Sequence, residues 1–524
     1  MTDAYMDYLF DESRVVGHAE YIAFPQTEEE LVTVVRYCDA HNLPLTAQGG
    51  LTGLTGGASP DGGLILNLSK MNRILGLRKG ADGCYYLRVE PGILLTQVRK
   101  ALSEKAFDIT DWDTASVEAL RDLKPGELFF SPDPTETTAS LGGMAACNAS
   151  GARSLLYGAT RVYVHGLRAV LADGRVTEVT RGRDRAQGRS FRLPCTDGTF
   201  LEGTIPDFDT PKHVVDAGFK FYDDMDLVDL FVGSQGTIGI ISQLEVRLIP
   251  APKLLWGATI FLPDDEVALK FVRAMKGERL PGVPHFTHIP ASLEFFNQRA
   301  LDMVMAYKQE SPAFQQLQEL PEDYVCAVYV EFNLMHENRF LPMLRELEQV
   351  VRAVGGDPER TWVARDGREL EKLLFFRHTV PEVTDIIVER NKKNEPCITI
   401  LSTDMAVDDV HFDELFHIYK HDLSQTDLDW VIFGHIGENH VHPNIFARDR
   451  AEYEFGLRLF EKWAADVHRM DGTITGEHGT GKLKKKLAYI MYGPEKMAKL
   501  CQFKRAMDPK GLLGPGNILT EVEA

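Results

Sequence analysis

Histidines near the C-terminal end of the sequence are spaced as metal ligands would be. The run WVIFGHIGENHVHPNIF, Trp430–Phe446, predicts two short strands about a turn. If Glu438 and Asn439 form a two-residue turn, His435 lies directly opposite His442 on one face of the hairpin. Cβ atoms of such pairs are about 4.5–5.5 Å apart, which lets two imidazoles bind one ion. We therefore expect His435 and His442 to be metal ligands.

A glutamate and a further histidine follow in GTITGEHGTGK, where Glu477 and His478 stand among glycines. Two histidines and a carboxylate can hold a catalytic divalent metal and leave positions open for a substrate. Glu477 is the expected third ligand. An ordinary polar loop residue is the alternative for any one of these histidines, but the clustering favours a metal site.

A glycine-rich stretch, TAQGGLTGLTGGA at Thr46–Ala58, can bind an anion through its backbone. Five glycines lie between Gly49 and Gly57, interleaved with Thr52 and Thr55. Glycine permits a positive φ, so consecutive N–H groups can converge on a phosphate, and threonine hydroxyls add donors. The stretch is neither a Walker loop nor GxGxxG, and a mobile surface loop is the alternative.

Two more segments of small residues strengthen the case for a cofactor. ASLGGMAACNASGARSLLYGATR, at Ala139–Arg161, is rich in small side chains, and Gly233–Thr237 forms a small-residue turn that enters a strand. Small residues let a backbone run close against a flat group. Three such loops indicate a large cofactor.

The composition excludes several classes of protein. The chain has 524 residues, so two or more domains are expected, and its net charge of -20 argues against nucleic-acid binding by bulk electrostatics. The seven cysteines form no CxxC pair, so neither a disulfide framework nor an iron-sulfur cluster is expected. No run of eighteen apolar residues occurs, and the N-terminus lacks a targeting pattern, so we expect a cytoplasmic protein without a transmembrane segment.

The elements that must position these residues alternate between helices and strands. Thr27, followed by three glutamates, predicts a helix start, and a short strand precedes the glycine stretch. Two strands are expected about the turn at residues 172–174, followed by a loop-like insertion over Gly182–Asp209. Prolines at 250 and 252 and longer helical patterns beyond them indicate a domain boundary near residue 250. These patterns predict an α+β or α/β fold.

Together these segments resemble the FAD-binding domain of the vanillyl-alcohol-oxidase superfamily. The GHIGENHVHPN and EHG motifs further resemble its D-2-hydroxy-acid dehydrogenase branch, which includes D-lactate and glycolate dehydrogenases, and the resemblance spans nearly the whole chain. It implies an α+β fold with a two-subdomain FAD-binding domain over 1–250, an α/β cap domain carrying the metal site over 251–480, and a C-terminal helical segment, 481–524, that packs back on the FAD-binding domain.

The resemblance implies FAD as cofactor, held noncovalently because no histidine or cysteine stands out as a covalent anchor. It also implies a divalent metal, which the sequence leaves open between Zn, Mn and Fe. The residues expected at the FAD are Gly49, Gly50, Thr52, Gly53, Leu54, Thr55, Ser140, Gly142, Gly143, Asn148, Gly151, Gly236, Thr237, Gly239, Ile240 and Asn517.

By the mechanism of this branch, the metal binds the carboxylate and hydroxyl of a small anionic 2-hydroxy acid, His478 accepts the hydroxyl proton, and a hydride passes to flavin N5. Arg377 is expected to bind the substrate carboxylate, with a structural salt bridge as the alternative. The branch often has lysine where this chain has Ser402, which favours a monocarboxylate over 2-hydroxyglutarate.

The chain also departs from the family pattern in its FAD loops and in its histidine motif. Gln48, Leu51 and Gln235 stand where arginine, glycine and glutamate are usual, which predicts weaker or altered FAD binding rather than none. Glu438, Asn439 and His440 replace the usual DGN run, and the role of His440 is open between an extra ligand and a partner of a ligand.

Two other functions compete with the dehydrogenase. One is a non-redox FAD enzyme of the alkylglycerone-phosphate-synthase type, and the other is a non-catalytic FAD-binding electron-transfer subunit. For a dehydrogenase we expect an electron-acceptor protein, which is an electron-transfer flavoprotein, an iron-sulfur subunit or a quinone-linked chain. A homodimer and peripheral attachment to a membrane are both compatible with the sequence. Substrate chirality and the acceptor stay undecided.

Overall fold

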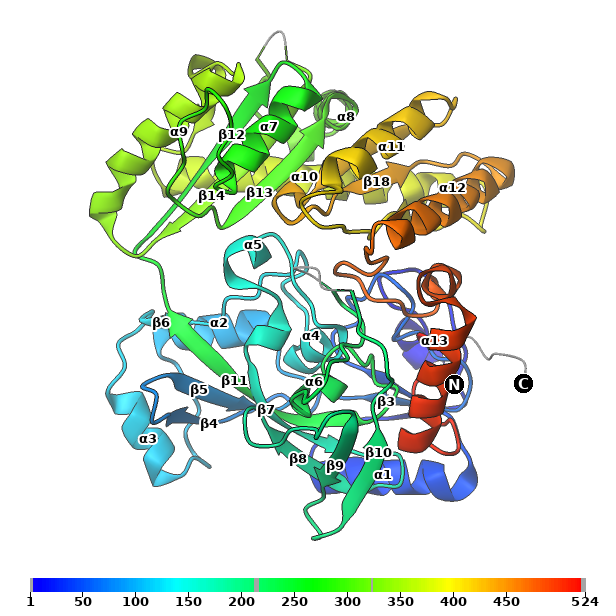
Figure 1. The fold of residues 1–524 in the computed structure, drawn as a ribbon. Coiled ribbons are helices and arrows are strands. Elements are labelled where there is room, and N and C mark those ends of the chain that lie inside the picture. Colours follow the sequence, from blue (N-terminus) through cyan, green and yellow to red (C-terminus); the bar gives the residue numbers. More distant parts are fainter. Residues whose placement is uncertain (1–2, 212–215, 322–323, 520–524) are drawn as a thin grey trace. The chain divides into compact units, whose positions relative to one another are not determined.

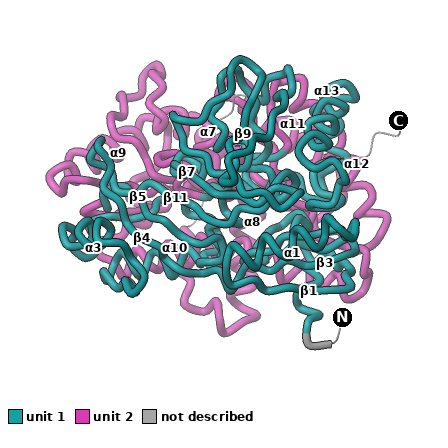
Figure 2. Tube along the Cα trace, turned by 90° about the horizontal axis from the view of Figure 1, so that it is seen from below, with its two compact units in different colours: residues 1–151, 158–251, 475–524 teal, residues 152–157, 252–474 magenta. Residues whose placement is uncertain are grey.

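A computed structural model of the protein describes residues 3–211, 216–321 and 324–519 (Figure 1). The chain forms two compact units, which Figure 2 colours separately. Unit 1 contains Met1–Gly151, Gly158–Ala251 and Thr475–Ala524, and unit 2 contains Ala152–Tyr157 and Pro252–Ile474. The functional division into FAD-binding, cap and C-terminal domains stays a prediction.

A small parallel sheet of unit 1 leads into the glycine stretch. Its strand order is β1 (Tyr21–Ala23), β3 (Leu64–Asn67) and β2 (Leu45–Gln48). Helix α1 (Glu28–His41) begins as predicted, because the Thr27 side chain accepts a hydrogen bond from the Glu30 N–H. Leu31, Val35 and Cys38 of α1 are buried in one core cluster with residues of β2 and β3.

Unit 1 also contains a larger, six-stranded antiparallel sheet. The order is β4 (Ile74–Lys79), β5 (Tyr85–Val89), β11 (Ile240–Pro250), β7 (Val164–Val170) and β8 (Val176–Thr180), with β6 (Leu128–Phe129) also paired to β11. Strands β7 and β8 form the predicted hairpin, with Val170 opposite Val176. The turn contains Gly174 at a φ of +78°.

The interpretation of Gly182–Asp209 as a loop is wrong for part of its length. β9 (Ser190–Pro194) and β10 (Phe200–Thr204) pair there as an antiparallel hairpin. Phe191 and Leu193 of β9 are buried, while Ser190 and Arg192 between them are exposed. Five residues with only two apolar side chains are a weak strand signal, and burial within unit 1 outweighs it.

The remaining helices of unit 1 are short except for the last. They are α2 (Leu95–Glu104), α3 (Thr114–Arg121), α4 (Leu141–Cys147), α6 (Val228–Phe231) and α13 (Lys485–Met507). Gly493 and Pro494 interrupt α13, where Gly493 has a φ of +69°.

Unit 2 is built on a seven-stranded antiparallel sheet. The order is β15 (Trp362–Val363), β12 (Leu254–Leu262), β14 (Cys326–Leu334), β13 (Ser292–Asn297), β17 (Trp430–Gly434), β18 (His442–Ile445) and β16 (Leu401–Ser402). The helices are α5 (Ser154–Tyr157), α7 (Asp265–Met275), α8 (Gln298–Glu310), α9 (Phe340–Val354), α10 (Gly367–Lys392), α11 (Phe412–Ser424) and α12 (Arg450–Arg469).

The central strand β13 is buried on both faces. Neighbouring side chains of a strand point to opposite sides, and Phe295 packs edge-on against Phe416 of α11 while Phe296 packs against Phe376 of α10. A strand covered on both faces is apolar throughout. The exceptions in β13 are the buried polar residues Ser292, Glu294 and Asn297, and Glu294 lies on the same side as Phe296. Within the described part of the chain, no helix is both long and apolar enough to cross a membrane.

Candidate functional site

The glycine stretch of unit 1 packs closely against the start of α4. A Cβ atom on Gly49 would lie 2.2 Å from the Ser140 Oγ, and one on Gly50 would lie 2.7 Å from the Thr138 carbonyl oxygen. Only glycine therefore fits at these two positions. The Gly50 N–H donates to the Ser140 Oγ at 3.2 Å, so the loop is fixed to the second small-residue segment, which is predicted to contact the same cofactor.

The backbone of the loop leaves a run of N–H groups available to an anion. Its carbonyl oxygens face the protein and accept hydrogen bonds: Leu51 O from Glu12 N, Gly53 O from Ser13 N, Thr55 O from Lys482 N, Gly56 O from Ser59 N and Gly57 O from the Asn517 side chain. The N–H groups of residues 51–57 have no acceptor among the residues that the structure describes. Consecutive N–H groups left in this way form a nest for phosphate, so the loop fits the diphosphate of FAD.

Gln48 does not take the place of the arginine that the family pattern has at this position. Its side-chain nitrogen donates to the carbonyl oxygens of Tyr8 at 2.7 Å and Ala58 at 2.8 Å. One proton of the buried amide thus joins the two ends of the loop, and the other holds the loop to Tyr8. Gln48 shapes the loop and contributes no cation to it.

The second small-residue segment is held from behind by polar contacts. Gly142 packs on Pro91, whose carbonyl oxygen accepts from the Gly142 N–H at 2.8 Å. Asn148 ends α4 with a φ of +50°, accepts from the Arg161 N–H at 2.8 Å and donates to the Asp216 carbonyl oxygen at 2.7 Å. The Asn148 amide therefore links the end of α4 to the backbone at Arg161 and at Asp216.

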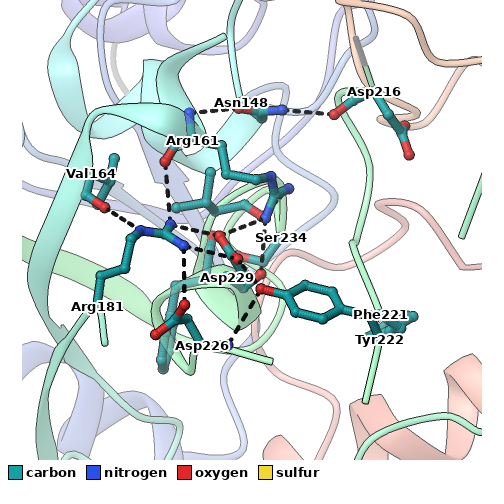
Figure 3. A network of polar contacts seen from close by, with 12 residues as sticks. Asn148, Arg161, Val164, Arg181, Asp216, Phe221, Tyr222, Asp226, Asp229 and Ser234 are labelled. Carbon is teal, nitrogen blue, oxygen red and sulfur yellow. Dashed lines mark hydrogen bonds and ion pairs between the residues drawn. The ribbon is translucent and has the colours of Figure 1, made fainter. Parts of the chain in front are cut away.

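A buried ion network lies next to this segment (Figure 3). Asp229 accepts from Arg181 at 2.7 Å and from Arg161 at 3.3 Å, and Tyr222 donates to it at 2.8 Å. Burial works to raise the pKa of Asp229, but the two arginines outweigh burial and lower this pKa to about 2. Arg161 also donates to the Val232 carbonyl oxygen at 2.8 Å, directly before the third glycine turn.

The third turn, Gly233–Thr237, is joined to the EHG segment within unit 1. The Gln235 Oε1 accepts from the Gly481 N–H at 2.8 Å, while its Nε2 is buried without a hydrogen-bond partner among the described residues. A Cβ on Gly479 would lie 2.7 Å from that nitrogen. Asn517 donates to the Gly57 carbonyl oxygen at 2.8 Å. Unit 1 thus brings the three predicted FAD loops and Asn517 into one framework.

In unit 2, His435 and His442 lie side by side, but not in the predicted register. His442 pairs with Phe433, and a 3-10 turn, η6 (Ile436–Glu438), lengthens the connection between β17 and β18. The prediction of a two-residue turn at Glu438 and Asn439 is therefore wrong. The rings nevertheless approach, with centroids 5.6 Å apart and planes at 82°.

Hydrogen bonds from Nδ1 orient both imidazoles. His435 donates from Nδ1 to the Glu294 carboxylate at 2.7 Å, and His442 donates from Nδ1 to the Thr403 carbonyl oxygen at 2.8 Å. A metal-binding histidine commonly has its second nitrogen fixed by a carboxylate or a carbonyl. Nε2 is then the nitrogen that would bind an ion, so this donor set fits a divalent metal.

Arg377 of α10 belongs to the same group of side chains. Its Nε lies 3.9 Å from the Glu294 Oε2, and both side chains are largely buried. Burial alone would raise the pKa of Glu294, but the neighbouring His435 and Arg377 lower it overall. Glu294 was not among the predicted site residues. The carboxylate between the apolar residues Leu293 and Phe295 is the signal that could have found it.

The absence of a side chain at Gly434 leaves room for the imidazole of His442. The residue has a φ of +126°, and a Cβ on it would lie 2.4 Å from the His442 Cδ2. The imidazole therefore rests on the bare backbone of Gly434.

The unusual residues of the motif also have partners in unit 2. The His440 Nε2 lies 3.0 Å from the Asp404 Oδ1, and its ring centroid lies 4.5 Å from that of His442. Glu438 accepts a hydrogen bond from the Ser154 hydroxyl at 2.6 Å. His440 thus stands beside His442 with a buried carboxylate behind it.

Glu477 and His478 lie in unit 1, whereas His435, His442 and Arg377 lie in unit 2. The His478 Nε2 is 3.2 Å from the Glu477 Oε1, and both side chains are only slightly exposed. The His478 carbonyl oxygen accepts from the Thr55 hydroxyl at 3.2 Å. The predicted base is therefore attached to the glycine loop.

Two family models match the sequence. One is described as FAD binding domain and matches residues 19–120 and 114–180, and the other is described as FAD linked oxidases, C-terminal domain, and matches residues 258–518.

Curated relatives match along almost the whole chain. A D-lactate dehydrogenase of Anaerostipes hadrus is 26% identical over 534 residues, which cover 98% of this chain and 92% of the relative. Glycolate oxidase subunit GlcD of Bacillus subtilis (strain 168) is 24% identical over 502 residues, which cover 95% of this chain and 88% of the relative.

A solved structure of p-cresol methylhydroxylase with substrate bound has the same fold. Its TM-score is 0.66 at 16% sequence identity, and the match covers 100% of this chain and 94% of that one. At this identity the likeness concerns the fold alone, and it confirms the predicted fold class.

Proposed function

Because the chain belongs to the family of FAD-linked oxidases, we propose that this oxidoreductase converts a D-2-hydroxy acid to the 2-oxo acid at a site that requires a divalent metal. The observation that carries the proposal is the pair His435 and His442, each oriented through Nδ1. The family membership that the motifs predicted is confirmed. The predictions of an enzyme and of FAD as its cofactor are confirmed as well.

The glycine loop would hold the cofactor noncovalently. The N–H groups of residues 51–57 supply donors for the diphosphate, and the turns at Asn148 and Gly233–Thr237 complete the binding region. When bound, FAD supplies the hydride acceptor. The reduced protein would pass its electrons to an acceptor protein.

His435, His442 and Glu477 would hold the metal. Nitrogen and carboxylate donors suit Zn, Mn and Fe. When bound, the ion lowers the pKa of the substrate hydroxyl. Glu294 and the Thr403 carbonyl oxygen keep the two imidazoles oriented throughout.

His478 would accept the proton of the substrate hydroxyl at an imidazole nitrogen. A base must lie within hydrogen-bond reach of that proton, and the contact from Thr55 to the His478 carbonyl oxygen fixes the backbone at this residue. Arg377 would bind the substrate carboxylate, because a guanidinium offers two parallel donors. Ser402 in place of lysine favours a substrate without a second carboxylate.

The test mixes purified, metal-replete protein with D- and L-2-hydroxy acids under anaerobic conditions and follows the visible absorption of the flavin. We expect D-lactate or glycolate to bleach the flavin and 2-hydroxyglutarate to do so more slowly. The His478→Ala variant should lose at least about a hundredfold in reduction rate, since general bases contribute about 10²–10⁴-fold.

His468→Ala is the matched control, because His468 is exposed on α12 and should leave the reduction rate unchanged. Bound FAD that no 2-hydroxy acid reduces would contradict the proposal. A non-redox flavoenzyme or a non-catalytic electron-transfer subunit would then be the better description.

A further inference from the structure

The segment that carries His478 is attached to the glycine loop through its backbone. The Thr55 hydroxyl donates to the His478 carbonyl oxygen at 3.2 Å, and the Lys482 N–H donates to the Thr55 carbonyl oxygen at 2.8 Å. A Cβ on Gly481 would lie 2.2 Å from that carbonyl oxygen, so glycine is required for the approach. Two hydrogen bonds and one close contact therefore join residues 478–482 to Thr55.

The Lys482 side chain adds a second connection. Its Nζ donates to the Gly56 carbonyl oxygen at 3.2 Å and to the Asn517 Oδ1 at 2.8 Å. Asn517 in turn donates to the Gly57 carbonyl oxygen at 2.8 Å. Lysine and asparagine together hold two successive carbonyl groups of the loop.

These contacts determine where the N–H groups of the loop point. In a trans peptide the C=O of one residue and the N–H of the next point in opposite directions. When Lys482 holds the Thr55 and Gly56 carbonyl groups, the N–H groups of Gly56 and Gly57 are turned away from Lys482. Both belong to the set without an acceptor among the described residues. The lysine therefore shapes the anion nest from the outside.

We propose that Lys482 is a positioning residue that makes the glycine loop and the His478 segment one structural unit, so that FAD binding and the placement of His478 are thermodynamically coupled. The inference rests on the proposed function only for the role of His478. Reciprocity follows from linkage: whatever orders the His478 segment must also tighten FAD binding.

The charge of Lys482 gives this coupling a pH dependence. Burial lowers the pKa of Lys482 to about 8, while Asp61 and Asp11 favour its charged form and Lys485 opposes it. The ammonium is present below this pKa and is lost as the pH rises through it. Neutral Lys482 is a weaker donor to the loop, so the affinity for FAD should fall between about pH 7 and 9.

The experiment uses the full chain, stripped of flavin and titrated with FAD. Flavin fluorescence gives the affinity, and amide hydrogen exchange gives the protection of residues 49–58 and 476–483. In the wild type, FAD should slow exchange in both segments. Lys482→Met should lower the affinity on the order of tenfold, abolish its fall with pH, and uncouple the protection of 476–483 from FAD.

Three further variants define the outcome. Lys482→Arg keeps the charge and should retain the affinity, now without a fall near pH 8, while Lys70→Met removes an exposed lysine and should change nothing. Thr55→Val keeps Lys482 and removes the hydroxyl contact to His478, so 476–483 should respond less to FAD. It serves as the test if Lys482→Met does not fold.

Protection of the loop alone in the wild type would overturn the proposal, as would Lys482→Met protein that binds FAD like the wild type. No hydroxy acid is present, so a failure of acid oxidation leaves this result unaffected. The two proposals therefore fail separately.

Discussion

Glu294 is a buried ionised group in β13, the central strand of unit 2. Taking a carboxylate out of water is costly unless opposite charges and hydrogen bonds replace the water. His435 supplies a hydrogen bond at 2.7 Å, Ser292 another at 3.0 Å, and Arg377 a charge at 3.9 Å. The same contacts that make the carboxylate tolerable also fix the imidazole of His435.

Replacement of Glu294 by glutamine should weaken metal binding without removing a ligand. The amide no longer carries the charge that favours the Nδ1–H form of His435, and loss of such a partner costs about 10–100-fold in affinity. Zinc affinity is measured by competition with a chelator. Glu371→Gln, an exposed change on α10, is the control. Equal affinity in both variants would show that Glu294 only supports the fold.

The connection between β17 and β18 is longer than the tight turn of a simple hairpin. The sequence motif suggested a two-residue turn, which would set His435 opposite His442. Instead the chain makes a 3-10 turn, and Asn439 takes a φ of +57°. Its side chain bonds to Lys276 at 2.9 Å and to Asp409 at 2.8 Å. These distant partners stabilise the longer turn.

Gly434→Ala tests whether this connection positions His442. Both Gly434 and Gly277 have a left-handed φ, so an alanine at either should cost on the order of 1–2 kcal/mol of unfolding free energy. Only Gly434 is crowded, and the neighbouring atom belongs to a side chain that can move.

We therefore expect similar losses of stability in urea for the two variants, but a large loss of zinc affinity for Gly434→Ala alone. Equal zinc affinities would mean that the ring does not depend on the bare backbone of Gly434.

Local signals explain what the sequence could predict. Thr27 with three following glutamates identified the start of α1, and the turn at 172–174 identified the β7–β8 hairpin, because caps and turns act over a few residues. The approach of His435 to His442 was predicted, but their register was not. The hairpin of β9 and β10 and the part played by Glu294 depend on residues far away in sequence, which no local pattern contains.

At the scale of a whole unit, the Asp229 network should shape the acid stability of unit 1. Because the pKa of Asp229 is about 2 in the fold against an ordinary value of 3.8, its ionisation stabilises the fold above about pH 4. This part of the stability, about 2 kcal/mol, is lost as the pH falls from about 4 to 2.

Asp229→Asn leaves two buried arginines without their carboxylate, so the variant should be less stable by about 3–5 kcal/mol at pH 7. The difference in urea midpoint between wild type and variant should shrink below pH 4. A difference that stays constant from pH 7 to pH 3 would mean that Asp229 is not ionised in the fold.

The discontinuous course of the chain has a consequence for biosynthesis. The glycine loop leaves the ribosome long before Lys482 and Asn517, the residues that hold it from the other side, have been translated. At about 5–20 residues per second, some 400 intervening residues separate these events by roughly 20–80 s. During that interval the nascent loop lacks the contacts from Lys482 and Asn517. Flavin capture is therefore expected only after Lys482 and Asn517 have been translated.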